Sequence, residues 1–212
     1  VWVAPHAPYT CTPEQIRESL KLCERNGVGV NIHVAETLSE VETIRERYGK
    51  TPVEHLRDLG VFDYRALAVH CVHLTETDME ILSRQGVSVV YNPQSNMKLA
   101  SGIAPVSEFL RRKIPLAIGT DGPASNNALN MFREMYLAAV LQKLREEDAA
   151  SCDEREILRA ACSTGARAMR IDADCIAPGK LADLVVIDLH QANMQPEHNT
   201  VKNLVYSGSK QN

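Results

Sequence analysis

Short runs of Val, Ile, Leu and Ala recur along the chain, and longer segments with a helical apolar period separate them. Five runs are long enough to form strands: 1–5, 28–34, 66–71, 87–91 and 115–119. Most are apolar at nearly every position, as expected for strands of a parallel sheet that is covered on both faces. Strands and helices that alternate in this way build βα units, so we predict an α/β protein.

The segments between the runs carry signals for helix starts and ends. Thr12, Pro13 and Gln15 supply an N-cap hydroxyl, a proline at the first helical position and a capping box, and Gly27 ends that helix. The same Thr-Pro pattern predicts a helix at 51–59. Further helices are predicted from Thr77 to about Gly86, over 128–146 and over 154–169.

The 212 residues are fewer than the roughly 250 of a complete (β/α)8 barrel. We predict that residues 1–177 are the C-terminal portion of a TIM-like barrel, about strands 4 to 8. Two further apolar runs, 182–189 and 201–206, have no helix between them, so residues 178–212 are predicted to begin a small β-sandwich domain. The chain opens in an apolar run without Met, and we expect further sequence upstream.

Charge and cysteine content restrict the classes of function. A net charge of −4 gives no electrostatic reason to expect nucleic acid or an anionic membrane, and a small-molecule substrate fits better. The apolar runs are shorter than the roughly 20 residues of a membrane helix. Six scattered cysteines without a CxxC pair indicate reduced thiols in a cytoplasmic protein.

Polar side chains follow the predicted strands at their carboxyl ends. They are His6, His33, His70, Asn92 and Asp121. In a parallel barrel these ends open onto one face, where barrel enzymes place their active sites. We therefore expect the five side chains to converge.

His33 and Glu36 form a His-x-x-Glu pattern in which the imidazole can bind a metal and the carboxylate can shuttle protons. Asp121 can coordinate the same ion or accept a proton from its water, and the glycines on either side leave room. The alternatives are a core histidine beside a solvated glutamate and an ordinary Asp-Gly turn.

His70 is expected to share a strand face with Ala68 and Val72 and to polarise the hydrolytic water, although a structural histidine is the alternative. His6, between two prolines, could hold a substrate hydroxyl, and the amides of 92–96 could orient a ligand or form a plain turn. No role is assigned to four other histidines: His73, which we expect to leave the site, and His55, His190 and His198, expected on a helix surface or in polar loops.

Six segments, taken in order, resemble the amidohydrolase superfamily and, within it, the 5-methylthioadenosine/S-adenosylhomocysteine deaminases. The segments are 5–9 (PHAPY), 33–37 (HVAET), 69–73 (VHCVH), 92–99 (NPQSNMKL), 119–127 (GTDGPASNN) and 178–184 (PGKLADL). The resemblance covers nearly the whole chain, and the joint order of the segments is more specific than any one of them.

The resemblance implies a hydrolytic deaminase that converts 5-methylthioadenosine, S-adenosylhomocysteine or adenosine to the inosine analogue and ammonia. It implies one divalent metal, usually zinc and sometimes iron, with His33 and Asp121 as ligands. Glu36 would protonate the purine ring, His70 would stabilise the attacking hydroxide and His6 would contact the ribose, so that Glu36, Asp121 and His6 form the substrate site.

The family pattern begins with a His-x-His pair that these residues lack, whereas catalytic zinc usually takes three protein ligands. The alternatives are therefore a related hydrolase of guanine, cytosine or a triazine, and an inactive fragment or partner-dependent subunit. An intact mass near 23.5 kDa would favour the fragment. The preferred nucleoside, the metal and a homo-oligomeric state are left open.

Overall fold

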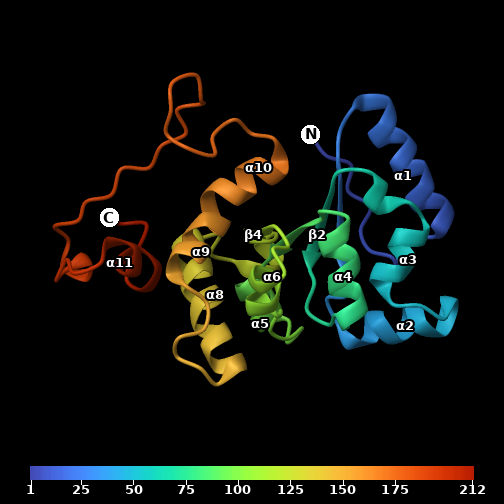
Figure 1. The fold of residues 1–212 in the computed structure, drawn as a ribbon, viewed down its shortest axis with the longest axis horizontal. Coiled ribbons are helices and arrows are strands. Elements are labelled where there is room, and N and C mark those ends of the chain that lie inside the picture. Colours follow the sequence, from blue (N-terminus) through green and yellow to red (C-terminus); the bar gives the residue numbers. More distant parts are fainter.

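A computed structural model describes all 212 residues, and its centre is a four-stranded parallel sheet (Figure 1). The strands are β1 (Val30–Val34), β2 (Ala66–His70), β3 (Ser88–Tyr91) and β4 (Leu116–Ile118). They lie in chain order, and each pairs in parallel with the next. The predicted parallel α/β architecture is confirmed.

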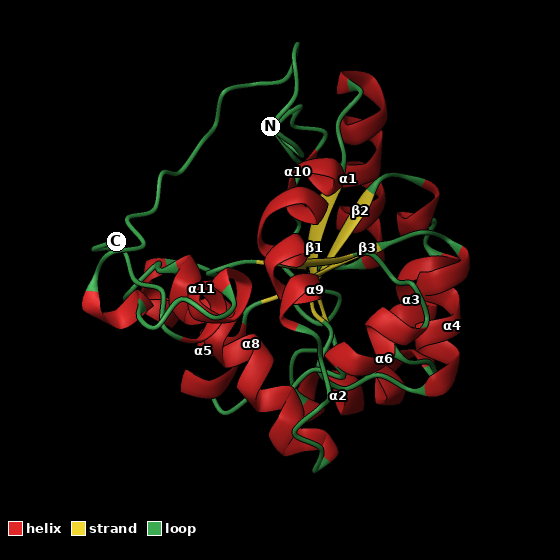
Figure 2. Cartoon of the chain, turned by 60° about the vertical axis from the view of Figure 1, so that its left-hand side comes forward, coloured by secondary structure: helices red, strands yellow, loops and turns green.

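Helices connect the strands and pack against the sheet (Figure 2). They are α1 (Pro13–Asn26), α2 (Leu38–Tyr48), α3 (Pro52–Asp58), α4 (Glu76–Arg84), α5 (Pro93–Lys98), α6 (Val106–Arg111), α7 (Pro123–Asn126), α8 (Met131–Glu146), α9 (Glu154–Arg159), α10 (Gly165–Met169) and α11 (Thr200–Tyr206). Two short 3-10 turns cover Val61–Asp63 and Ala192–Met194. A π-helical turn, Ala160–Thr164, joins α9 to α10, so the helix predicted over 154–169 forms with one irregular turn.

The helix starts follow the capping chemistry of the sequence. Thr12 and Thr51 each form a capping box with proline in the first turn, as predicted. The start expected at Thr77 is wrong, because Thr75 caps α4. The carboxylate of Asp78 accepts the Thr75 N–H, and the Thr75 hydroxyl accepts the Asp78 N–H, which fixes the start at Thr75.

The strand predicted at 1–5 is reduced to an isolated bridge between Val3 and Val30. Val3 accepts the N–H of Asn31 and His6 accepts that of His33, so the segment still runs along β1. Pro5 has no N–H to donate between these two bonds, and the ladder is interrupted there.

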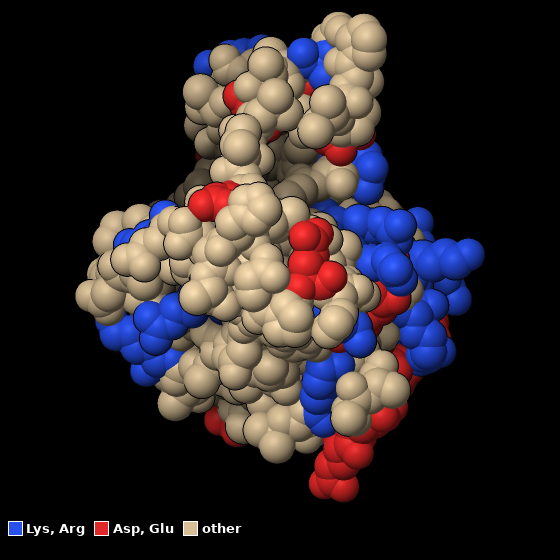
Figure 3. Space-filling view, turned by 90° about the vertical axis from the view of Figure 1, so that its left-hand side faces the viewer, with Lys and Arg blue, Asp and Glu red and all other residues tan.

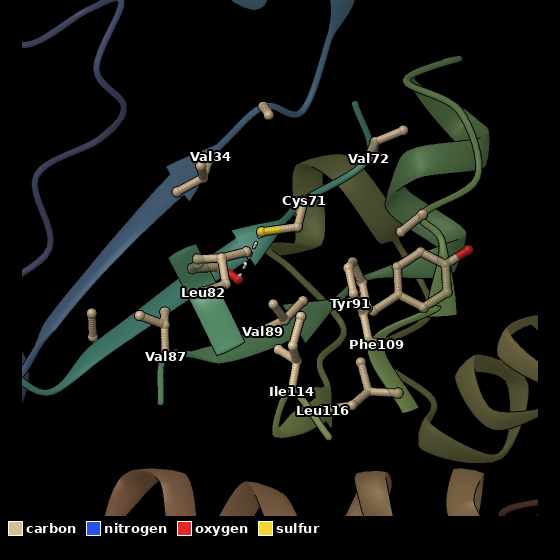
Figure 4. Close-up of a cluster of buried hydrophobic side chains, with 14 of the residues drawn as sticks. Val34, Cys71, Val72, Leu82, Val87, Val89, Tyr91, Phe109, Ile114 and Leu116 are labelled. Carbon is tan, nitrogen blue, oxygen red and sulfur yellow. Dashed lines mark hydrogen bonds between the residues drawn. The ribbon is translucent and has the colours of Figure 1, made fainter. Parts of the chain in front are cut away.

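An apolar core fills the space between sheet and helices (Figure 4). Tyr91 and Leu116 on neighbouring strands, together with Phe109 and Ile114 from the connection between them, are almost completely buried. Burial of each such side chain stabilises the folded state by roughly 1.5–3 kcal/mol. These contacts hold the connection between β3 and β4 against the sheet.

Both strands predicted in the C-terminal segment are wrong. Residues 182–189 are irregular, and Val185 and Val186 are 80% and 90% exposed, because no other strand lies beside them to accept their backbone hydrogen bonds. Residues 201–206 belong to α11, which begins at the Asn199 cap and buries Val205. A short apolar run fits a helix as well as a strand, and here the contacts with α8 and α9 select the helix.

The C-terminal segment lies to one side of the sheet, and most of the surface in a view from that side carries neither acidic nor basic side chains (Figures 1 and 3). A domain boundary near residue 178 stays a prediction.

None of the helices combines the length and the apolar character needed to cross a bilayer. All six cysteines are free, and three of them are buried.

Candidate active site

Three histidines meet at the carboxyl ends of the first strands. The ring centroids of His6 and His33 are 4.9 Å apart, and those of His33 and His70 are 5.1 Å apart. Burial, followed by the neighbouring rings of His70 and His6, lowers the pKa of His33. A lowered pKa favours the neutral imidazole, which is the form that binds metals.

The side chain of His70 lies on a different face of the sheet from the one that strand alternation predicts. Leu67 and Val69 line the cavity with His33, whereas Ala68 and Val72 belong to the apolar core. The expected sharing of a face with Ala68 and Val72 is therefore wrong. The backbone at His70 has a φ of 72°, and this left-handed turn ends the regular alternation at the last residue of β2.

Glu36 lies in the loop after β1 and contacts the cluster through His70. Its Oε2 is 3.7 Å from His70 Nε2, and its Oε1 accepts a hydrogen bond of 3.0 Å from Ser101 Oγ. The carboxylate is thus held at the wall of the site. Ser101 was not predicted, since nothing in the sequence relates residue 101 to residue 36.

A second carboxylate, Glu40, was also missed. It is 1% exposed, and its two oxygens accept the backbone N–H groups of Ala35 and Glu36, each at 2.8 Å. Burial raises the pKa of Glu40 to about 7. The Thr37-x-x-Glu40 spacing resembles a capping box, and that signal could have drawn attention to it.

Asp121 follows β4 in a left-handed conformation, with φ of 59°. Its Oδ2 accepts a 2.6 Å hydrogen bond from Ser95 Oγ, and its Oδ1 accepts one from Gly122 N. Burial opposes ionisation, but these bonds and the nearby His70 and His33 outweigh it and lower the pKa of Asp121. The carboxylate is therefore ionised at neutral pH.

Gly119, two residues before Asp121, makes room for a protein side chain. A Cβ at Gly119 would lie 2.5 Å from Oδ1 of Asn92, whereas a Cβ at Gly122 would meet nothing within 4 Å. Asn92 is 3% exposed and packs against the end of β4. The amide of Asn92 takes the space directly beside Gly119, and Gly119 also lines the cavity that contains Asp121.

His33, Asn92 and Asp121 line one cavity of about 290 Å³. Imidazole nitrogen and carboxylate oxygen are ligands that zinc accepts, so the two predicted donors fit a metal in their chemistry. No group of three His, Cys, Asp or Glu side chains is arranged to hold an ion. Any metal here would need ligands beyond this pair.

The remaining histidines have separate roles. His6 Nδ1 pairs with Thr10 Oγ1 at 2.7 Å, and His73 Nε2 pairs with the Ser101 carbonyl oxygen at 2.7 Å. His55 is 5% exposed and stacks on Tyr48 with centroids 4.0 Å apart, so its expected place on a surface is wrong. The apolar stripe of α3 is wide enough to include it. His190 and His198 are exposed.

A parallel sheet with histidines and carboxylates at its carboxyl edge agrees with the family model that matches the sequence. The model of the amidohydrolase family matches residues 1–211, and the chain belongs to this family.

Two curated relatives within the family share much of their sequence with this chain. The chain is 51% identical to a 5-methylthioadenosine/S-adenosylhomocysteine deaminase of Caldanaerobacter subterraneus, across 98% of this chain and 48% of the relative. It is 44% identical to a 5'-deoxyadenosine deaminase of Methanothermobacter thermautotrophicus, across 99% of this chain and 49% of the relative. The chain spans about half the length of these relatives.

A solved adenosine deaminase of Xanthomonas campestris with bound zinc superimposes with a TM-score of 0.93 at 41% identity, across 97% of this chain and 47% of that one. A triazine hydrolase variant superimposes with a TM-score of 0.90 at 22% identity, across 96% of this chain and 45% of that one, and shares the fold. The architecture is therefore that of about half of an amidohydrolase chain.

Proposed function

We propose that the chain is the C-terminal half of a metal-dependent deaminase. The enzyme would convert 5-methylthioadenosine, S-adenosylhomocysteine or adenosine to the corresponding inosine analogue and ammonia. The observation that carries this proposal is the approach of Glu36 to His70 beside the neutral imidazole of His33. The names of the relatives at 51% and 44% identity support the substrate class.

His33 and Asp121 would hold the metal, with zinc as the first candidate and iron as the alternative. When bound, the metal supplies hydroxide from water at neutral pH. The ionised carboxylate of Asp121 suits a ligand that stays charged during the reaction. The ligands beyond this pair would come from sequence outside these residues.

Glu36 would deliver a proton to the ring nitrogen beside the amine-bearing carbon, because its carboxylate reaches the site and is only 18% exposed. His70, whose Nδ1 is paired with Asn96, has Nε2 available to orient the nucleophile. His6, whose Nδ1 is paired with Thr10, has Nε2 available for a ribose hydroxyl. One water is consumed and one ammonia is released for each turnover.

We also propose a cytoplasmic location and a small nucleoside as the partner, because six free thiols fit a reducing compartment. The fold shared with triazine hydrolases leaves ring specificity to the substrate contacts rather than to the barrel.

Ammonia release from the whole polypeptide, as it is made in the cell, tests the proposal. The panel contains the three adenosine analogues, guanine, cytosine and a triazine, and the protein is loaded with zinc or with iron. We expect activity on at least one adenosine analogue, and His198→Ala, at an exposed position, is the matched control. Activity confined to guanine, cytosine or the triazine, or none on any substrate, overturns it.

A further inference from the structure

One short segment contacts three of the predicted reactive side chains. Ser95 donates to Asp121 Oδ2, Asn96 pairs with His70 Nδ1, and Ser101 donates to Glu36 Oε1. The three contacting residues are 0%, 0% and 4% exposed. We propose that Ser95, Asn96 and Ser101 are positioning residues that align Asp121, His70 and Glu36 for one reaction, an inference that rests on the proposed deaminase function.

We infer that Asn96 selects the protonated nitrogen of His70. Its Oδ1 lies 3.1 Å from His70 Nδ1, and an amide oxygen can only accept, so this contact forms when Nδ1 carries the proton and Nε2 keeps its lone pair. Nε2 is the nitrogen that faces Glu36. The Nδ2 of Asn96 is buried without a partner. A leucine of similar size would avoid that unpaired donor, so the contact with His70 explains the amide better than packing does.

Ser101 fixes the direction of the Glu36 carboxylate. With Oε1 bound to the Ser101 hydroxyl, Oε2 is the oxygen directed at His70. The serine is itself held at both ends, because its N–H donates to the Asn96 carbonyl at 2.8 Å and its carbonyl pairs with His73 Nε2 at 2.7 Å. His73 thus acts on the site through the Ser101 backbone.

Ser95 and its neighbours join the segment to Asp121 and to α7, which follow β4. Gln94 N donates to Glu134 Oε2 at 3.1 Å, and Asn126 Nδ2 donates to Glu134 Oε1 at 2.6 Å. Glu134 is completely buried on α8, so one carboxylate fixes both segments. Asp121 therefore keeps its position relative to Ser95.

The activity test uses the protein at its cellular length with Ser101→Ala and Ser95→Ala. We expect kcat to fall about 10- to 100-fold in each variant, as is usual when a partner of a reactive group is removed. KM should stay within about threefold of the parent, and Ser95→Ala should also weaken metal retention against a chelator by a similar factor. Ser83→Ala is the control, because its hydroxyl donates to Arg112 O away from the site. Unchanged kcat in both variants overturns the proposal.

The tautomer test does not depend on activity. In nitrogen-15 NMR spectra at pH 8, His70 should show the Nδ1–H tautomer, with the signal assigned by its loss in His70→Gln. Asn96→Asp, which keeps an acceptor, should retain it, whereas Asn96→Ala should shift the ring toward Nε2–H. Asn96→Leu replaces Asn96→Ala if the smaller side chain does not fold. An unchanged tautomer without the acceptor overturns the role of Asn96. If the parent protein releases no ammonia, the deaminase proposal fails, whereas the spectrum still decides whether Asn96 sets the tautomer of His70.

Discussion

The rings of His33 and His70 lie 5.1 Å apart, although regular alternation along β2 would place His70 on the opposite face of the sheet. The left-handed backbone at His70 brings the two rings together. Ala35 and Asp121 have positive φ angles at the ends of their strands as well. Such conformations are costly, so the contacts around these three strand ends must hold them in place.

Replacing Glu36 with Gln should lower kcat by about 10²- to 10⁴-fold, the usual contribution of a general acid or base. The amide keeps the shape and can still accept from Ser101, so KM should change little. Steady-state ammonia release measures both constants. Glu42→Gln, at an exposed position of α2, is the control and should match the parent. Near-normal turnover in Glu36→Gln would rule out proton transfer by Glu36.

The two glycines beside Asp121 should respond differently to alanine. At Gly119 the new Cβ would collide with Asn92 Oδ1, and such overpacking costs about 1–3 kcal/mol of unfolding free energy. At Gly122 the φ of −76° and the open surroundings accept a Cβ. Urea unfolding and metal retention should both weaken in Gly119→Ala and remain unchanged in Gly122→Ala. Equal behaviour of the pair would contradict the packing of Asn92 against β4.

The sequence predicted the sheet because each of β1 to β4 is a buried apolar run between capped helices. It placed His33 and Asp121 correctly at strand ends for the same reason. It failed at 182–189 and 201–206, where apolar residues have no neighbouring strand and the choice between helix and strand depends on distant contacts. Local patterns cannot report such contacts.

The contacts around the predicted reactive groups could not be predicted from the sequence, for a similar reason. Ser101 and Glu36 are far apart along the chain, and only the path of the segment after α5 joins them. His70 was predicted at the site from its place at the end of a strand, and it lies there. Only the face it was expected to share with Ala68 and Val72 was wrong, since the turn at its own backbone could not be anticipated. Glu40 alone carried a local signal, in the spacing from Thr37.

The capping threonines Thr12 and Thr51 should differ in their contribution to stability. Thr12→Ala removes a cap on an exposed helix end and should cost about 1 kcal/mol. Thr51→Ala removes a similar cap and also the hydroxyl that donates to Asp78, which is 1% exposed, so the cost should rise to roughly 2–3 kcal/mol. Urea unfolding measures both, and equal costs would contradict the Thr51–Asp78 contact.

Glu40 should make stability depend on pH. Its pKa is about 7 in the folded protein, against an ordinary value of 4.5, so between these values the folded state holds a proton that the unfolded state lacks. The free energy of unfolding therefore falls as pH rises from about 4.5 to 7, by an amount on the order of 3 kcal/mol. Glu40→Gln should flatten this slope in urea titrations, and Glu42→Gln should keep it. A parent slope equal to that of Glu40→Gln would contradict the burial of Glu40 as an acid.

The most direct test of the shared metal site is anomalous diffraction at the zinc edge from crystals of the zinc-loaded protein at its cellular length. The account predicts one peak at about 2.0–2.2 Å from both a His33 ring nitrogen and an Asp121 carboxylate oxygen. A peak bound to other residues, or the absence of a peak between these two side chains, would contradict it.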